Sequence, residues 1–134
     1  MYTLGTRSKQ RLSGVHPDLC AVVELAISLS KHDFTVLEGL RSLERQKVLY
    51  KAGASSTMNS RHLTGHAIDI APYPTGADFD SDGVINIEDW DEYYPLADVM
   101  KAAAKELKVK LEWGGDWKKF PDGPHFQLSW SEYK

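Results

Sequence analysis

The sequence predicts an α+β domain in which about three helices pack with a small, mostly antiparallel sheet. The chain has 134 residues, enough for one domain with its own hydrophobic core. The order of helical and strand patterns along the chain favours helices packed against a sheet of short strands. No internal repeat or linker interrupts the sequence. We therefore expect a single domain over residues 1–134.

Three segments have the apolar spacing of amphipathic helices. The first spans about residues 17–30, with Pro17 where it suits the first turn of a helix. The second, "LERQKVLYKA", follows Ser42 as a candidate N-cap and ends before Gly53, a residue type that commonly stops helices. The third is "PLADVMKAAAKELK", whose larger apolar residues fall on one face.

Four segments are typical of short strands. "DFTVLEGL" is rich in β-branched and apolar residues, and "HAIDIAPY" has the alternation that a strand requires. "KLEWGG" and "HFQLSW" flank a polar loop near the end of the chain. We expect these four segments to form the sheet.

The composition excludes several classes of protein. Hydrophobic residues make up 42% of the chain and charged residues 26%, with a mean hydropathy of −0.41. The net charge of −3 makes neither nucleic acid nor an anionic membrane an expected partner. The first residues contain no apolar run long enough for a signal peptide or a membrane helix. A single cysteine, Cys20, excludes an internal disulfide.

The stretch "SRHLTGHAID" gathers side chains that bind metals. His62, His66 and Asp69 offer imidazole and carboxylate groups, and a glycine between them lets the chain fold back. His125, in "PDGPHFQL", is another histidine set among expected strand and turn residues. A catalytic zinc site usually has three protein ligands and leaves the fourth position to water. These residues are sufficient for one such site.

A further carboxylate accompanies the last histidine. Asp122 precedes His125 by three residues, across a Gly-Pro bend that directs it toward the same point. Hydrolysis at a zinc site uses such a group, because the metal acidifies a water and the carboxylate takes its proton. The residues alone leave three possibilities open, a metal site, a pH switch and a polar loop.

Two motifs, in this order, resemble those of the zinc peptidases that cleave peptidoglycan peptides. "SRHLTGHAID" fits Ser-x-His-x-x-Gly-x-Ala-x-Asp, and "DGPHFQL" fits Asp/Glu-x-x-His. These peptidases comprise D-Ala-D-Ala carboxypeptidases and dipeptidases and L-alanyl-D-glutamate endopeptidases, and they share a fold with the hedgehog signalling domain. The resemblance includes "EGLRSLERQ" and "EWGGDWKKF". The compact length is most similar to phage endolysins of the L-alanyl-D-glutamate class.

The resemblance implies roles for five residues. It makes His62, Asp69 and His125 the zinc ligands and places Asp122 at the position of the catalytic base. Arg41, in "GLRS", matches an arginine that holds the substrate or the developing oxyanion. A guanidinium suits that task because it is a permanent cation with several fixed donors.

Other residues receive weaker expectations from the same resemblance. Ser60 and Gln46 match recurrent positions and are expected to support substrate binding. Trp117 and Trp113 are expected either to line the substrate groove or to pack in the core. His66 falls at a variable position of the motif, so the resemblance removes it from the ligand set.

A second metal is expected in the segment "DFDSDGVINIED", residues 78–89. Aspartates at loop positions 1, 3 and 5, a glycine at 6 and an acid at 12 follow the calcium loop of EF-hands. The last acid is an aspartate in place of the usual glutamate, which resembles the loops of dockerin modules. Calcium would be a structural or activating ion. The expected ligands are Asp78, Asp80, Asp82, the Val84 carbonyl, Asn86 and Asp89.

We therefore expect a zinc-dependent peptidoglycan peptidase that hydrolyses the L-alanyl-D-glutamate bond, with calcium as a second ion. The expected partner is bacterial peptidoglycan, and we expect a monomer that binds neither nucleic acid nor membrane. The lack of a signal peptide fits a lysin made in the host cytoplasm and released to the wall in the periplasm. The alternatives are a D-Ala-D-Ala carboxypeptidase, a non-catalytic zinc module and a calcium-dependent binding module of the dockerin kind.

Overall fold

The structure is a computed structural model that describes residues 2–31, 33–53, 55, 58, 60–73, 93–118 and 121–133. The expected calcium loop, residues 78–89, lies outside the described residues, and its six expected ligands stay predictions. Within the described ranges, no helix is both long enough and apolar enough to cross a bilayer.

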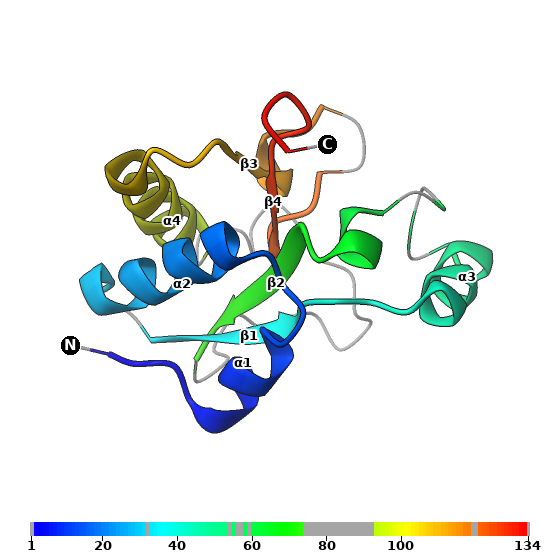
Figure 1. The fold of residues 1–134 in the computed structure, drawn as a ribbon, viewed down its shortest axis with the longest axis horizontal. Coiled ribbons are helices and arrows are strands. Elements are labelled where there is room, and N and C mark those ends of the chain that lie inside the picture. The colour runs from blue at the N-terminus through cyan, green and yellow to red at the C-terminus, as the bar shows by residue number, and fades with distance from the viewer. Residues whose placement is uncertain are drawn as a thin grey trace.

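A four-stranded antiparallel sheet forms the centre of the fold (Figure 1). Each of the four segments predicted to be strands contributes one strand, and the spatial order is β1-β2-β4-β3. The predicted α+β class with a small antiparallel sheet is confirmed. The strands are β1 (Phe34–Glu38), β2 (Ala67–Pro72), β3 (Leu111–Trp113) and β4 (His125–Leu128).

The described part of the chain contains four α-helices, one more than the sequence predicts. The extra helix is the first, whose sequence "TRSKQR" has no apolar residue and therefore no apolar periodicity. The last helix begins just before the predicted "PLADVM". The helices are α1 (Thr6–Arg11), α2 (Pro17–Leu29), α3 (Leu43–Lys51) and α4 (Tyr93–Leu107). Two short 3-10 helices, η1 (Arg61–Thr64) and η3 (Gly114–Asp116), precede β2 and follow β3.

The helix ends lie where the sequence displays capping residues. Ser42 is the N-cap of α3, and its Oγ accepts a hydrogen bond from the backbone N–H of Arg45 at 3.1 Å. Gly53 follows the end of α3 with a φ of 77°, a left-handed conformation that favours glycine. Pro17 begins α2 as predicted.

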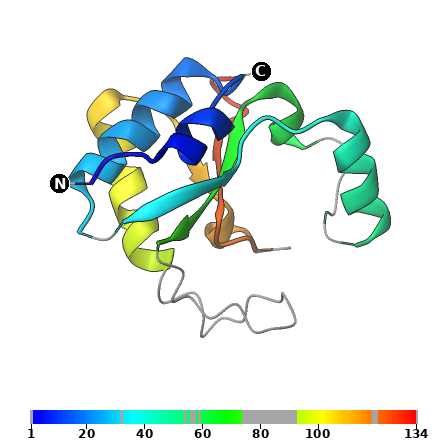
Figure 2. The same ribbon diagram turned by 90° about the horizontal axis from the view of Figure 1, so that it is seen from below.

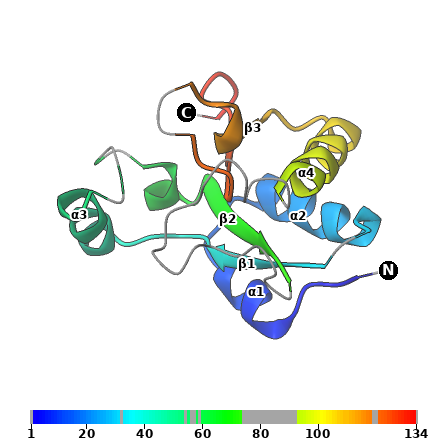
Figure 3. The ribbon, with the colours of Figure 1, turned by 180° about the vertical axis from the view of Figure 1, so that it is seen from behind.

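The hydrophobic core joins the sheet to α2 and α4, which pack against each other. These two helices lie at one end of the molecule and α3 at the other (Figures 1, 2 and 3). Apolar residues on one face of each helix meet the inner strands, which removes a continuous apolar surface from water. Fully buried members include Leu19, Val22, Val23, Leu96, Met100, Val36, Ile68, Ile70, Phe126 and Leu128.

β2 is an inner strand of the sheet, between β1 and β4. All of its residues are buried except Asp69, which is half-buried. An acid in the middle of a buried strand needs charged or hydrogen-bonding partners, because burial penalises its ionised form. The partners of Asp69 define the candidate site.

Candidate active site

Asp69 is the centre of a cluster that joins the stretch of residues 60–69 to β4, more than fifty residues further along the chain. It lies directly opposite His125 in the pairing of β2 with β4. Opposite residues of an antiparallel pair point to the same face. Oδ1 of Asp69 is 3.3 Å from Nδ1 of His125 and 3.3 Å from Nε2 of His62. The candidate ligand atoms of the three residues all lie within 4.8 Å of one another.

The backbone between β1 and α3 fixes the ring of His62. Nδ1–H of His62 donates to the carbonyl oxygen of Gly39 at 2.8 Å, and the carbonyl of His62 accepts from the N–H of Arg41 at 2.9 Å. Ser60 caps η1, since its Oγ accepts from the N–H of His62 at 3.2 Å. With Nδ1 held by Gly39, the other ring nitrogen, Nε2, faces Asp69.

Gln127 fixes the ring of His125. Nε2–H of His125 donates to Oε1 of Gln127 at 2.8 Å, which leaves Nδ1 facing Asp69. Histidines that bind metals generally donate the second ring N–H in this way. Gln127 belongs to no motif and was not predicted, although a spacing of two from His125 on a predicted strand places both residues on one face.

The donor set of His62, Asp69 and His125 fits a zinc ion. Imidazole nitrogen and carboxylate oxygen are usual zinc ligands, and the ligand atoms of tetrahedral zinc lie roughly 3.3 Å apart. Burial by itself raises the pKa of Asp69, but the hydrogen bonds and positive charges of His125 and His62 outweigh it and hold that pKa well below its usual range. Asp69 is therefore an anion, the form that binds a cation.

The main chain of Asp122 is held against Gly114 at the end of β3. The N–H of Asp122 donates to the carbonyl of Gly114 at 2.9 Å, and the N–H of His125 donates to the carbonyl of Asp122 at 3.2 Å. A Cβ at position 114 would lie 2.4 Å from the carbonyl oxygen of Asp122, so a side chain has no room there. The glycine thus permits the close approach that places Asp122 beside His125.

Trp113 supports the same turn from the core. It is buried, its ring stacks on Phe126, and its Nε1–H donates to the carbonyl of Gly123 at 2.7 Å. The carbonyl of Pro124 accepts from the N–H of Ile70 at 2.9 Å, which ties the turn to β2. Of the two roles left open for Trp113, the structure favours core packing.

The carboxyl group of Asp122 titrates near neutral pH. Burial and then the negative charge of Asp69 raise the pKa of Asp122 to about 6, against the opposing positive charges of His125, His62 and Arg41. The side chain starts beside that of His125, because a Cβ at position 114 would lie 3.1 Å from Cβ of Asp122 and 3.0 Å from Cβ of His125. A carboxyl group with such a pKa can both accept and return a proton under working conditions.

Tyr93, at the start of α4, is a buried neighbour of the cluster that the sequence analysis did not single out. Burial, followed by the negative charges of Asp122 and Asp69, raises the pKa of Tyr93 far above its usual range. Its hydroxyl therefore stays neutral beside the two carboxyl groups. No motif marked this residue, since it lies at the edge of the insert.

Arg41 reaches the cluster from the connection between β1 and α3. Nη2 of Arg41 is 3.8 Å from Oδ2 of Asp69, and the side chain is largely buried. The structure thus brings together all five residues to which the resemblance gives a direct role. They are Arg41, His62, Asp69, Asp122 and His125.

The residues expected to support substrate binding lie in different settings. Trp117 is half-buried at the edge of the cluster, with its ring centroid 5.0 Å from that of His125. Ser60 caps η1, as described above. Gln46 is fully buried and hydrogen-bonded to Arg41, so its side chain lies behind Arg41 and not on a surface that a substrate could contact. Substrate binding by these residues stays a prediction.

His66 lies outside the cluster, in agreement with its removal from the ligand set. Its Nδ1 is 2.7 Å from Oγ1 of Thr64, and its ring lies near His16, with centroids 5.5 Å apart. Nδ1 of His16 in turn accepts the N–H of Asp18 at 3.1 Å, so His16 is the N-cap of α2.

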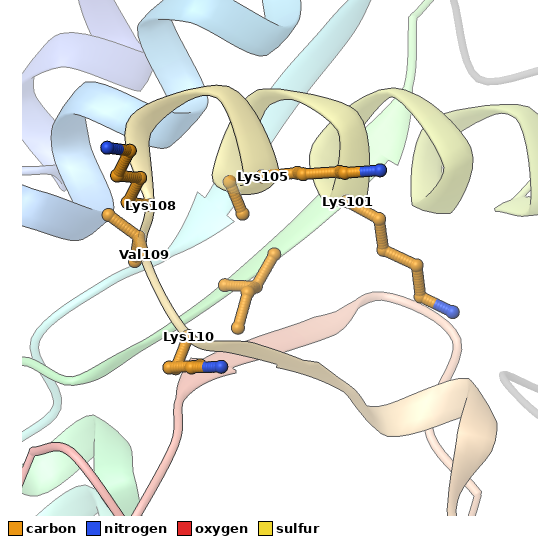
Figure 4. Close-up of a pocket in the computed structure, with 7 residues that line it drawn as sticks. Lys101, Lys105, Lys108, Val109 and Lys110 are labelled. Carbon is orange, nitrogen blue, oxygen red and sulfur yellow. The ribbon is translucent and has the colours of Figure 1, made fainter.

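A separate pocket of about 430 Å³ lies between the end of α4 and β3 (Figure 4). One of its lysines, Lys105, lies in the last turn of α4, where a cation interacts favourably with the negative C-terminal end of the helix. None of the residues that line the pocket belongs to the cluster of His62, Asp69 and His125. The lining residues are Lys101, Ala104, Lys105, Lys108, Val109, Lys110 and Leu111.

A small α+β domain that gathers two histidines and an aspartate beside a further acid and an arginine is typical of metal-dependent hydrolases. The chain belongs to the phage L-alanyl-D-glutamate peptidase family, whose model matches residues 1–128. The family resemblance inferred from the two motifs is confirmed.

Known relatives agree with this assignment. The chain is 33% identical over 119 residues to the L-alanyl-D-glutamate peptidase of Escherichia phage T5, covering 87% of this chain and 82% of that protein. It spans only 31% and 60% of two longer relatives, the L-alanyl-D-glutamate peptidase of Listeria phage A118 and the endopeptidase CwlK of Bacillus subtilis.

Solved structures share the fold. The crystal structure of the Serratia marcescens L-Ala D-Glu endopeptidase ChiX matches with a TM-score of 0.83 and 45% identity, over 98% of this chain and 93% of that chain. The vancomycin resistance D,D-dipeptidase VanXYg matches with a TM-score of 0.52 and 17% identity, over 85% of this chain and 50% of that chain. The second likeness concerns the fold alone.

Proposed function

We propose that this chain hydrolyses the L-alanyl-D-glutamate bond of peptidoglycan stem peptides, with a zinc ion held by His62, Asp69 and His125. The observation that carries the proposal is the position of Asp122 beside that donor cluster. A zinc site that only stabilised the fold would need no further acid near its ligands. The names of the phage T5 and Serratia relatives supply the bond.

Asp122 is the proposed general base and acid. A zinc ion in the cluster would supply Lewis-acid chemistry, which acidifies water and polarises a carbonyl group. The carboxylate of Asp122 accepts a proton from the attacking water and later returns it to the leaving amine. Its pKa of about 6 supports both transfers, because the group changes protonation state near neutral pH.

Arg41 is the proposed stabiliser of the negative charge that develops on the carbonyl oxygen. A guanidinium is a permanent cation. Nη2 of Arg41 faces the cluster, 3.8 Å from Oδ2 of Asp69. Donors that are oriented in advance stabilise a transition state without reorganisation. Trp117, beside His125, offers an aromatic surface for the peptide.

We also propose that the segment of residues 78–89 binds one calcium ion. The support is its sequence, since several aspartates in one loop repel one another unless a cation neutralises them. Calorimetry with millimolar calcium should detect one site in the wild type and none in an Asp80→Asn, Asp82→Asn double variant. No binding heat from the wild type at that concentration would refute this part of the proposal.

The proposed setting is the bacterial cell wall. The single domain of residues 1–134 would act as a monomer on peptidoglycan after release from the host cytoplasm; the support for the substrate is the name of the L-alanyl-D-glutamate peptidase of phage T5. Size-exclusion chromatography with light scattering tests the oligomeric state, and a mass of twice 15.1 kDa would contradict a monomer.

Mass spectrometry of digested peptidoglycan tests the reaction itself. The zinc-loaded protein is incubated with purified peptidoglycan, and the released fragments are compared with those of an Asp122→Asn control. We expect new peptides that begin with D-glutamate. Loss of terminal D-alanine alone would identify a carboxypeptidase, and an unchanged fragment pattern would indicate a non-catalytic zinc module; either result contradicts the proposal.

A further inference from the structure

Two side chains fix the guanidinium of Arg41. Nε–H of Arg41 donates to the carboxylate of Glu38, and Nη1–H donates to Oε1 of Gln46 at 2.7 Å. The remaining nitrogen, Nη2, is the one that lies 3.8 Å from Oδ2 of Asp69. A planar group held at two of its three nitrogens cannot rotate, so the direction of its remaining donors is set before a substrate arrives.

An irregularity in the pairing of β1 with β2 places Glu38. The register shifts just before Glu38, which then pairs with Asp69. Such bulges redirect side chains and are frequent beside functional sites. The next residue, Gly39, accepts the Nδ1–H of His62 through its carbonyl. The end of β1 therefore orients both Arg41 and His62.

Gln46 is the buried residue of a helix whose other residues are exposed or half-buried. Its side chain has no solvent-exposed surface, whereas Leu43 and Val48 of the same helix are more than half exposed. Nε2–H of Gln46 donates to Oγ of Ser55 at 2.8 Å, while Oε1 accepts from Arg41. A buried amide is tolerated when both of its ends are hydrogen-bonded. The buried amide of Gln46 therefore connects α3 to Arg41.

We propose that Glu38 and Gln46 are positioning residues that hold Arg41 toward the carbonyl oxygen of the substrate, and that Ser55 fixes Gln46. This inference rests on the proposed function of Arg41. Gln46 then acts through Arg41 and touches no substrate, which differs from the substrate-binding role expected from its sequence position. The position of α3 would therefore affect turnover, although that helix contributes no reacting group.

Replacement of Gln46 tests this inference. Gln46→Met keeps the size of the side chain but removes the acceptor of Arg41, and we expect kcat to fall about 10- to 100-fold through misorientation of the guanidinium. KM should change less than about threefold, because Arg41 acts on charge that appears in the transition state. Gln46→Glu retains an acceptor and can accept from the hydroxyl of Ser55, so it should retain most of the activity. Gln10→Met, an exposed substitution on α1, is the matched control.

Glu38→Gln provides an independent variant. It keeps the shape of the side chain and one acceptor but removes the negative charge, so a smaller loss of kcat is expected, about 3- to 30-fold. Glu106→Gln on the exposed side of α4 is its control. Melting temperature and zinc content are measured for all variants, since a purely structural role would lower these and leave the kcat of the folded fraction unchanged.

Nuclear magnetic resonance of the Arg41 guanidinium gives a readout that does not depend on activity. We expect slowly exchanging N–H signals in the wild type that exchange faster in Gln46→Met and Glu38→Gln. If both variants fold and keep kcat within about twofold of the wild type, the inference is wrong. If the wild type hydrolyses nothing, the proposed function fails, and unprotected Arg41 signals in the wild type would separately overturn the positioning role.

Discussion

Asp69 and Asp122 share one site, yet the pKa of Asp69 is lowered and that of Asp122 is raised. Hydrogen bonds and charge from His62 and His125 overcome burial and keep the pKa of Asp69 below its usual range. Burial and the charge of Asp69 raise the pKa of Asp122 to about 6. When the environments of two acids push their pKa values apart in this way, the acid with the lower pKa suits a permanent anion and the other suits proton transfer. This division matches the proposed roles of Asp69 as a metal ligand and Asp122 as the general base.

Loss of the Asp122 carboxylate should stop catalysis and spare the metal site. Asp122→Asn retains the shape of the side chain but cannot accept a proton, so we expect kcat to fall about 10²- to 10⁴-fold. The zinc content should stay at that of the wild type, because the ligand atoms are unchanged. Steady-state kinetics and elemental analysis measure both. His125→Ala is the contrasting variant and should lose zinc as well as activity.

The same substitution should stabilise the metal-free protein at neutral pH. A folded-state pKa of about 6, above the ordinary 3.8, means that Asp122 favours folding when protonated, and this contribution is lost as the pH rises through 6. Asp122→Asn stays neutral and should exceed the wild type in free energy of unfolding by about 3 kcal/mol above pH 7. The difference should shrink below pH 6 and vanish near the ordinary pKa.

Asp69 gives the opposite pH dependence. Because its pKa is lowered on folding, Asp69 contributes stability at a pH above the ordinary pKa of 3.8. That contribution is lost as the pH falls through the lowered pKa of the folded state. Both proteins retain Asp69, so the comparison between wild type and Asp122→Asn reports the carboxyl of Asp122 together with its charge interactions with Asp69 and His125. Urea denaturation in the presence of a chelator, repeated between about pH 4 and pH 8, measures the difference. Equal stability at every pH would show that Asp122 is not perturbed.

Gln127 should tune zinc affinity through His125. Gln127→Leu removes the acceptor of the Nε2–H of His125, so the ring loses its preferred tautomer and orientation. We expect zinc to bind about 10- to 100-fold more weakly, as measured by competition with a chromophoric chelator. Gln10→Leu, on the exposed side of α1, should leave affinity unchanged. Equal affinity in the two variants would contradict a supporting role for Gln127.

Gly114 should tolerate no side chain. In Gly114→Ala the new Cβ would meet the carbonyl oxygen of Asp122, and the turn that carries this residue must shift. We expect a loss of about 1–3 kcal/mol in stability together with reduced kcat. Gly5→Ala is the control, because nothing lies within 4 Å of a Cβ there. Thermal unfolding and kinetics measure both effects, and an unperturbed Gly114→Ala would show that the turn adapts freely.

The elements with a strong local signal could be predicted from the sequence. The helix caps at Pro17 and Ser42 and the apolar periodicity of α2 and α4 act within a few residues, so a single sequence displays them. The strands of the sheet were predictable for the same reason. α1 was not, because its one buried residue is Ser8, and it packs by polar contacts to β1.

The site was only partly predictable, because its supporting contacts depend on tertiary structure. The resemblance indicated His62, Asp69 and His125 together, but the pairing of β2 with β4 that joins two of them needs the folded sheet. The partners of these residues carry no motif. Gln127 is an ordinary polar residue in the sequence, and although Gln46 matches a recurrent position, only the fold reveals that it is buried and holds Arg41.

Zinc titration of the chelated protein tests the central claim most directly. Metal is removed from the wild type, zinc is returned in steps, and release of peptides beginning with D-glutamate is followed by mass spectrometry. We expect no release from the metal-free protein and a rise that ends at one zinc per chain, with His62→Ala inactive throughout. Full release by wild-type protein that contains no zinc would contradict the claim that His62, Asp69 and His125 form the metal centre of a peptidoglycan peptidase.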